Sequence, residues 1–145
     1  MILFCDSSAL VKLYLVEDHS PAMKKALTAA ETAAVARVAW AEAFAAFARR
    51  ERETPADRGA LRSARKALAS DWPHYLVLDA SQSVVERSGD YAETFALRAY
   101  DSIQLATAQE LAQLSGARIA FACFDSRLNK AAKTLGMDAL FGELE

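Results

Sequence analysis

Short apolar runs along the chain alternate with longer segments in which apolar residues recur at helical spacing. A short apolar run bounded by turn residues is typical of a buried strand, whereas apolar residues three and four apart indicate one face of a helix. The predicted strands are residues 2–5, 32–37, 75–78 and 119–124, with a short edge strand at 137–141. The predicted helices are residues 7–17, a segment beginning at residue 20, and residues 38–53, 54–70, 81–99, 102–114 and 126–135.

Strands separated by helical segments predict a mainly parallel sheet of four or five strands with helices on both faces. The expected fold class is therefore α/β. No repeat, low-complexity linker or composition break divides the sequence, so we expect one domain over residues 1–145. Ser20 and Thr54, each followed by proline, are predicted helix caps. We expect Gly89 to interrupt the helix over 81–99 and Gly116 to end the next one.

Four carboxylates are placed where such a fold would gather them. Asp6 follows the first predicted strand, Asp125 lies at the end of the fourth, and Asp101 opens a helix. Glu42 lies in a helix whose neighbours are alanine, valine and aromatic residues. Ligands of open α/β sheets bind beyond the carboxyl ends of the strands, so we expect Asp6 and Asp125 to converge. Carboxylates crowded into one pocket repel each other, and a bound divalent cation removes that repulsion.

Each aspartate also has a purely structural explanation. Asp6, Asp101 and Asp125 all precede predicted helices, and aspartate is a preferred N-cap. Gln104 stands three residues after Asp101, as the partner in a capping box would. Glu42 fits this explanation less well, because a carboxylate among apolar neighbours needs a partner. Asp79 also follows a predicted strand, so spacing alone does not exclude it from the site.

Composition narrows the classes of function. The two cysteines, Cys5 and Cys123, are expected to be buried and reduced, and the two histidines, His19 and His74, to be exposed. No zinc-type ligand cluster is present in the sequence. No apolar run approaches the roughly 20 residues of a membrane span, and the first residues lack the basic start of a signal peptide. We therefore expect a cytoplasmic protein with no membrane partner.

The net charge of −2 does not by itself favour a nucleic-acid partner. Residues 49–66, however, hold seven basic and three acidic side chains, which gives that segment a charge of +4 (7 − 3). A basic face of this kind could hold RNA phosphates, with Arg49 and Arg50 as candidates. The alternative is a solvated helix surface whose charges pair with each other.

The sequence around the carboxylates resembles the PIN-domain ribonucleases, and specifically the VapC-type toxins of toxin–antitoxin pairs. Four segments carry this resemblance, in the family's order and over nearly the whole chain: residues 5–14 (CDSSALVKLY), 41–42 (AE), 97–108 (LRAYDSIQLATA) and 124–128 (FDSRL). The first and third are the specific ones. The family often has a histidine where this chain has Gln104. It also often has threonine or serine where this chain has Cys123, and a thiol is a poor hydrogen-bonding substitute that we expect to weaken the support of Asp125.

The resemblance implies a PIN-like three-layer α/β/α sandwich and endonucleolytic cleavage of RNA that depends on Mg²⁺ or Mn²⁺. Asp6, Asp101 and Asp125 would coordinate the metal, and Glu42 would be the fourth acid of the site, as a ligand or as a base. Ser7 and Ser126 are polar residues next to these acids and are candidates to support them, with helix capping as the alternative, and Arg98 is a further candidate for binding RNA. The resemblance also implies a cognate antitoxin as partner and a homodimer. The number of metal ions and the RNA target stay open.

Two other functions are compatible with a chain of this kind. The first is a PIN scaffold that keeps the acids but mainly binds a protein or RNA partner. The second is a phosphatase or phospho-acceptor domain with Asp6 as nucleophile. Haloacid-dehalogenase-type phosphatases need a second aspartate two residues further on, where this chain has Ser8, and receiver domains need additional acids that are also absent. The sequence therefore disfavours the second alternative.

Overall fold

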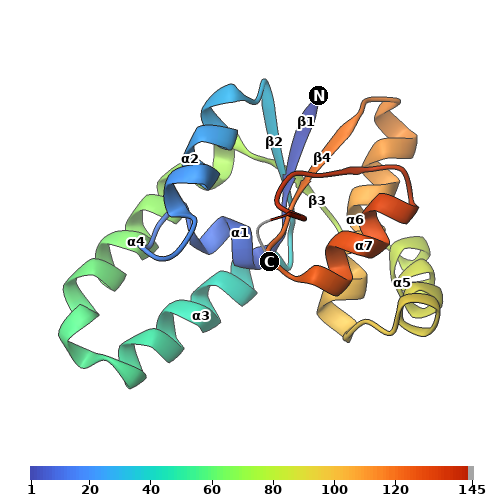
Figure 1. Ribbon diagram of the computed structural model, residues 1–145. Helices are drawn as coiled ribbons and strands as arrows, with labels where there is room; N and C mark the ends of the chain where they lie inside the picture. The colour runs from blue at the N-terminus through green and yellow to red at the C-terminus, as the bar shows by residue number, and fades with distance from the viewer. Residues whose placement is uncertain (144–145) are drawn as a thin grey trace.

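The computed structural model describes residues 1–143 as a parallel sheet with helices on both faces (Figure 1). The strands are β1 (Ile2–Cys5), β2 (Thr32–Ala36), β3 (Leu76–Leu78), β4 (Ile119–Ala122) and β5 (Asp138–Ala139). The helices are α1 (Ser7–Val11), α2 (Ser20–Ala29), α3 (Ala39–Glu53), α4 (Arg58–Asp71), α5 (Gln82–Phe95), α6 (Ala99–Ser115) and α7 (Ser126–Thr134). Two short 3₁₀ helices, η1 (Pro55–Asp57) and η2 (Trp72–His74), flank α4.

The strands lie in the order β3-β2-β1-β4-β5, and all of the pairs are parallel. The first strand therefore lies in the centre of the sheet, between β2 and β4. Its residues pair in register with both neighbours, so that Cys5 faces Val35 on one side and Ala122 on the other. The carboxyl ends of the three central strands consequently lie at one edge. The predicted α/β class, with a mainly parallel sheet of four or five strands, is confirmed.

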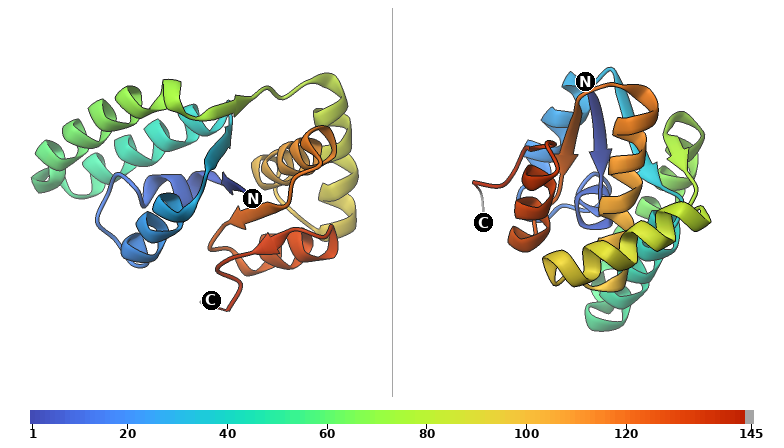
Figure 2. Two further views of the ribbon diagram at one scale, coloured as in Figure 1. Left: turned by 90° about the horizontal axis from the view of Figure 1, so that it is seen from above. Right: turned by 90° about the vertical axis from the view of Figure 1, so that its right-hand side faces the viewer.

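Alternate residues of the strands pack against two separate groups of helices. Leu3 and Cys5 belong to a core that includes residues of α1, α2, α3 and α4, whereas Phe4 and Phe121 belong to a core built with α6 and α7. Figure 2 shows the first four helices on one side of the sheet and α5, α6 and α7 on the other. The two layers result from the period-two alternation of side chains along buried strands.

Several helix boundaries differ from the sequence prediction. The first helix ends at Val11, because the following amides bond to carbonyls three residues back, as Leu13 N–H does to the Leu10 carbonyl. Gly89 does not interrupt its helix. The break falls instead at Ala96, which adopts a left-handed conformation with φ of 54°. Gly116 ends α6 in the left-handed conformation, as predicted.

Neither predicted serine or threonine cap acts as one. Ser20 is the first residue of α2 and His19 is its N-cap, without a side-chain bond to the helix. The Thr54 side chain also makes no capping hydrogen bond. Both cysteines are buried and not disulfide-bonded, and both histidines are exposed, as expected. Over residues 1–143, no helix combines the length and apolar character needed to cross a membrane.

Substitution of the two helix glycines by alanine should have opposite effects on stability. Gly89→Ala should raise the free energy of unfolding by roughly 0.5–1 kcal/mol, because Gly89 lies inside α5 and open space surrounds its Cβ position. Gly116→Ala should lower it by roughly 1–2 kcal/mol, because Gly116 has a φ of +67°. Urea unfolding of both variants tests this. Destabilisation by Gly89→Ala would show that α5 is interrupted there after all.

Candidate active site

Asp6 stands at the carboxyl end of the central strand and begins the first helix. Its Oδ1 accepts hydrogen bonds from the Ala9 backbone N–H at 2.9 Å and the Ser8 hydroxyl at 2.8 Å. It is therefore the N-cap of α1, as the structural explanation predicted. Only 4% of its surface is exposed. The cap fixes the carboxylate in one orientation at the edge of the sheet.

Burial raises the pKa of Asp6 to about 6, because desolvation disfavours the charged form. Hydrogen bonds from Ala9, Ser8 and the Cys123 thiol lower the pKa in part, and the negative charge of Asp101 raises it further. The interaction with Asp101 links two acids that are 95 positions apart in the sequence (101 − 6). Asp6 is thus a carboxyl group that the fold holds in an unfavourable electrostatic environment.

Glu42 is held by side chains from two other elements. It lies in the first turn of α3, and its Oε1 accepts a hydrogen bond from the Ser7 hydroxyl at 2.7 Å. The amide Nε2 of Gln104 donates to Glu42 Oε1 and to Ser7 Oγ, both at 2.9 Å. Glu42 therefore has the hydrogen-bond partners that a carboxylate among apolar neighbours needs. Gln104 is not the capping-box partner of Asp101 but a bridge between α1, α3 and α6.

Gln104 is only 2% exposed, and its Oε1 has no hydrogen-bond partner among the described residues. A buried amide oxygen without a partner costs free energy. The amide is held in place by its two donor bonds despite this cost.

The two remaining acids differ in how they are held. Asp101 lies inside the first turn of α6, so it is not a cap, and its Oδ2 is 3.3 Å from Nε of Arg98. Asp125 is exposed and is the N-cap of α7, with its Oδ1 accepting from the Leu128 N–H at 2.9 Å. The sulfur of Cys123 accepts from the Asp125 backbone N–H at 3.2 Å. Cys123 therefore contacts the backbone of Asp125 and not its carboxylate.

All four acids line one cavity of about 500 Å³ at the carboxyl edge of the sheet. The lining residues are Asp6, Ser7, Ser8, Val11, Lys12, Glu17, Glu42, Ala46, Arg98, Asp101, Gln104, Phe124 and Asp125. Sequence reasoning missed Lys12 and Glu17, because nothing in their spacing distinguishes them from surface charges of an amphipathic helix. Asp79 lies outside this cavity, exposed and paired with Arg37.

Three of the supporting residues proposed from the sequence do not line the cavity. Arg49 pairs with Glu53 at 3.0 Å, and Arg50 pairs with Asp57 at 3.0 Å. These pairs are what the alternative of a solvated, internally paired helix surface predicts. Ser126 is exposed at the start of α7 and is not among the lining residues. Of the proposed arginines, only Arg98 faces the acids.

Comparison with known proteins identifies the family of this chain. Residues 3–134 match the PIN domain. The chain belongs to the PIN domain family. It is 35% identical over 136 residues to Ribonuclease VapC46 of Mycobacterium tuberculosis (strain ATCC 25618 / H37Rv), which covers 93% of each protein. A solved toxin–antitoxin complex from Klebsiella pneumoniae is similar in fold, with a TM-score of 0.54 and 24% identity over 87% of this chain and 88% of that one. The resemblance inferred from the four motifs is confirmed.

The ligand atoms in the cavity of this PIN domain are of the type that a hard divalent cation prefers. The acids of the cavity offer carboxylate oxygens and no imidazole, which suits Mg²⁺ or Mn²⁺ better than zinc or copper. Within residues 1–143, no three His, Cys, Asp or Glu side chains are grouped closely enough to hold a metal ion as they stand. Mg²⁺ does not require three, because it is commonly held by one or two carboxylates and several waters.

The raised pKa of Asp6 predicts how stability depends on pH without metal. The Asp6 carboxyl group binds a proton more tightly in the folded protein than in the unfolded chain. Its contribution to the free energy of unfolding is therefore greatest below about pH 4 and falls as the pH rises through about 6. Asp6→Asn keeps a capping oxygen and removes the charge. It should therefore raise the free energy of unfolding at pH 7 by up to about 3 kcal/mol, and leave it unchanged at pH 4.

The measurement is urea unfolding in EDTA at both pH values, with Asp6→Ala as the matched variant. Asp6→Ala removes both the charge and the cap, so it should fall below Asp6→Asn by about 1 kcal/mol at either pH. Equal stability of wild type and Asp6→Asn at pH 7 would show that Asp6 is solvated and does not share a cavity with other acids.

Two near-isosteric changes separate the bridge made by Gln104 from its packing. Gln104→Met removes two donor bonds but also an unpartnered buried oxygen, so stability should change by less than about 1 kcal/mol. Gln104→Glu places a second carboxylate beside Glu42 and should cost about 3 kcal/mol at pH 7.5, with partial recovery near pH 5. Urea unfolding at the two pH values is the readout. A pH-independent loss shared by both variants would mean that only packing matters at this position.

Proposed function

We propose that this PIN domain is an endoribonuclease that requires Mg²⁺ or Mn²⁺ and acts as the toxin of a toxin–antitoxin pair. The observation that carries the proposal is the convergence of Asp6, Glu42, Asp101 and Asp125 on one cavity. The similarity to a protein named as a ribonuclease, over nearly the full length of both chains, supports it. The likeness to the toxin–antitoxin complex extends to the fold alone. An antitoxin partner and a homodimer are therefore proposed from the family resemblance.

In this proposal Asp6, Asp101 and Asp125 hold the metal, which when bound supplies a more acidic water and positive charge near the scissile phosphate. The capping bonds of Asp6 and Asp125 use Oδ1 and leave the second oxygen of each carboxylate uncommitted to the cap. Arg98, which is highly exposed, would release Asp101 and contact an RNA phosphate. A 5′-phosphate product is expected.

Glu42 is the residue proposed to orient or deprotonate the attacking water. Ser7 and Gln104 both donate to Oε1, which fixes the carboxylate plane and leaves Oε2 for a water in the cavity. A base must be held within hydrogen-bond reach of the proton that it takes. The bridge of Ser7 and Gln104 provides that constraint, whether Glu42 also contacts the metal or not.

Cleavage assays with matched aspartate variants test the proposed function. Wild type should cleave single-stranded RNA in Mn²⁺ or Mg²⁺ and lose this activity in EDTA. Asp6→Asn should lower the rate on the order of 10²–10³-fold, because a preorganised charged group at the reacting centre is lost. Asp79→Asn is the control, since Asp79 also follows a strand but lies outside the cavity. It should leave the rate unchanged.

Activity that survives EDTA, or an equal loss in both variants, would contradict the metal-nuclease proposal. RNA binding without cleavage by wild type in either metal would favour the alternative of a PIN scaffold that mainly binds a partner. Growth arrest on expression, relieved by Asp6→Asn and not by Asp79→Asn, would support the role as a toxin.

A further inference from the structure

Lys12 is a cation inside the acidic cavity to which the four-acid arrangement assigns no role. It follows the last residue of α1, and its side chain is only 13% exposed. Its Nζ lies 3.2 Å from Glu17 Oε1 and 5.0 Å from the centroid of the Phe124 ring. Lys12 and Glu17 both line the cavity that contains Asp6. A largely buried ammonium is unusual, because desolvation disfavours its charge.

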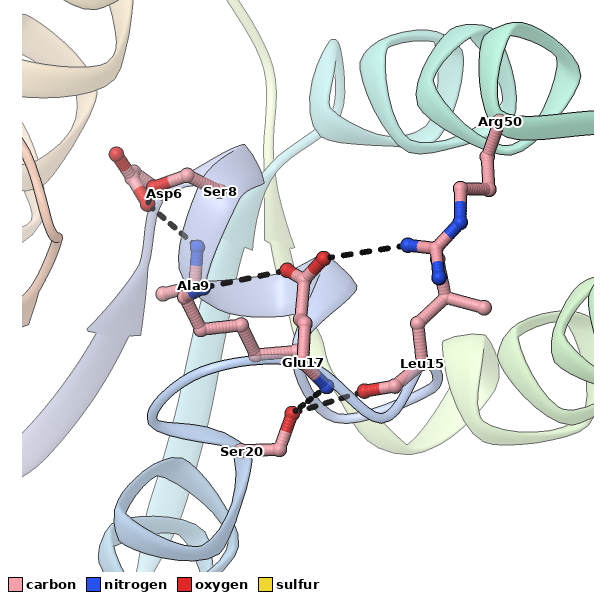
Figure 3. Close-up of polar contacts among 8 residues, drawn as sticks. Asp6, Ser8, Ala9, Leu15, Glu17, Ser20 and Arg50 are labelled. Atoms are coloured by element: carbon pink, nitrogen blue, oxygen red, sulfur yellow. Dashed lines mark hydrogen bonds and ion pairs between the residues drawn. The ribbon is translucent and has the colours of Figure 1, made fainter. Parts of the chain in front are cut away.

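The loop that follows α1 is built to hold Glu17 against this lysine. The buried Ser20 hydroxyl donates to the Leu15 carbonyl at 2.8 Å and accepts from the Glu17 backbone N–H at 3.1 Å. Arg50 of α3 lies 4.0 Å from the second carboxylate oxygen of Glu17. Figure 3 shows Ser20 below Glu17, the Glu17 carboxylate facing Arg50, and Asp6 at the upper left, at the start of α1. Glu17 is thus fixed at its backbone and at its carboxylate.

The pair leaves part of the lysine free for a ligand. An ammonium group has three donors, and among residues 1–143 one of them is donated to Glu17 Oε1. The Phe124 ring offers its face to the cation but accepts no conventional hydrogen bond. A lysine–glutamate pair of this burial adds little stability compared with apolar residues of the same volume. The remaining N–H donors of Lys12 are therefore available to a ligand in the cavity and add little to the stability of the fold.

We propose that Lys12 is a catalytic residue that contacts a non-bridging oxygen of the scissile phosphate, with Glu17 as its positioning residue. This inference rests on the proposed function, since it names how the same cavity binds RNA. Lys12 acts as a fixed charge and takes no part in proton transfer. It stabilises the charge on the phosphate oxygen while the water gives a proton to Glu42 and its oxygen bonds to phosphorus. The bond from phosphorus to the 3′-oxygen breaks, and that oxygen leaves as a hydroxyl with a proton from solvent.

The arginines near the cavity are less suited to this role. Arg50 is engaged by Asp57 and Glu17, and Arg98 is 86% exposed at the rim. A compact ammonium held by a carboxylate and an aromatic ring presents its charge at a defined point within the cavity. In this proposal Lys12 supplies a fixed positive charge beside the four carboxylates, in addition to that of a metal.

Lys12→Met tests the proposal, because methionine keeps an unbranched apolar side chain and removes the charge that lies over the Phe124 ring. Lys24→Met is the matched control, since Lys24 is exposed on α2 and lies outside the cavity. The probe is a short, fluorescein-labelled single-stranded RNA in EDTA, at about 50 to 200 mM KCl. Lys12→Met should weaken binding and reduce the slope of log Kd against log[KCl] by about 0.7, the value for one phosphate contact. Lys24→Met should match wild type.

Two further readouts separate a phosphate contact from a structural role. The rate of cleavage by Lys12→Met in Mn²⁺ should fall on the order of 10²-fold, a larger change than the rise in KM that the weaker RNA binding produces. Its Mn²⁺ affinity without RNA, measured by calorimetry, should become severalfold tighter, because a positive charge has left the cavity. Glu17→Gln keeps the lysine charge and should show an intermediate loss of rate, which tests the positioning role if Lys12→Met does not fold.

Equal RNA affinities and slopes for Lys12→Met and Lys24→Met, including failure of both to bind, would overturn the proposal. Weaker Mn²⁺ affinity together with a lower Tm in Lys12→Met would also overturn it, since a structural residue behaves in that way. If wild type cleaves no RNA but Lys12→Met alone loses RNA affinity, the nuclease function fails while the phosphate contact stands. If wild type cleaves RNA and Lys12→Met does so equally well, the nuclease function stands and the phosphate contact of Lys12 fails.

Discussion

Electrostatic repulsion between carboxylates that share one cavity is the constraint around which the carboxyl edge of this sheet is organised. Each acid is stabilised by different donor groups. Asp6 and Asp125 accept backbone N–H bonds as helix caps, Glu42 accepts from Ser7 and Gln104, and Asp101 is close to the Arg98 guanidinium. All four also lie at or within the first turn of a helix, where unpaired N–H groups and the helix dipole favour negative charge. The fold thus offsets the repulsion with donors drawn from several helices.

The strand order explains why these helix starts meet. From β1 the chain proceeds through β2 to β3 on one side of the sheet, and later places β4 and β5 on the other side. The pair of β1 and β4 is therefore a topological switch point, where open parallel sheets form a crevice. Asp6 follows β1, and Asp125 lies three residues beyond the end of β4 (125 − 122). Helix α6 runs back toward the start of β4, which places its first turn, with Asp101, at the same edge.

Much of this could be predicted from sequence because it depends on local patterns. Short apolar runs gave the strands, and the convergence of Asp6 and Asp125 followed from their positions after strands. The role of Gln104 could not be predicted, because its partners are 97 and 62 positions away and the local pattern favoured a capping box. The turn after Val11 was missed because its apolar residues keep helical spacing, although the backbone amides there bond to carbonyls three residues back.

Capping and metal binding are not competing explanations of these aspartates. A carboxylate has two oxygens, and a cap that occupies Oδ1 removes the rotational freedom of the side chain without using Oδ2. A ligand that is already oriented loses less entropy when a cation binds. Burial of Asp6 has a separate cost, since desolvation raises the pKa of its carboxyl group to about 6. A cation that binds beside Asp6 would relieve that cost, and protons would compete with it below about pH 6. The burial of the Asp6 carboxylate thus destabilises the folded protein, and positive charge that enters the cavity would remove this destabilisation.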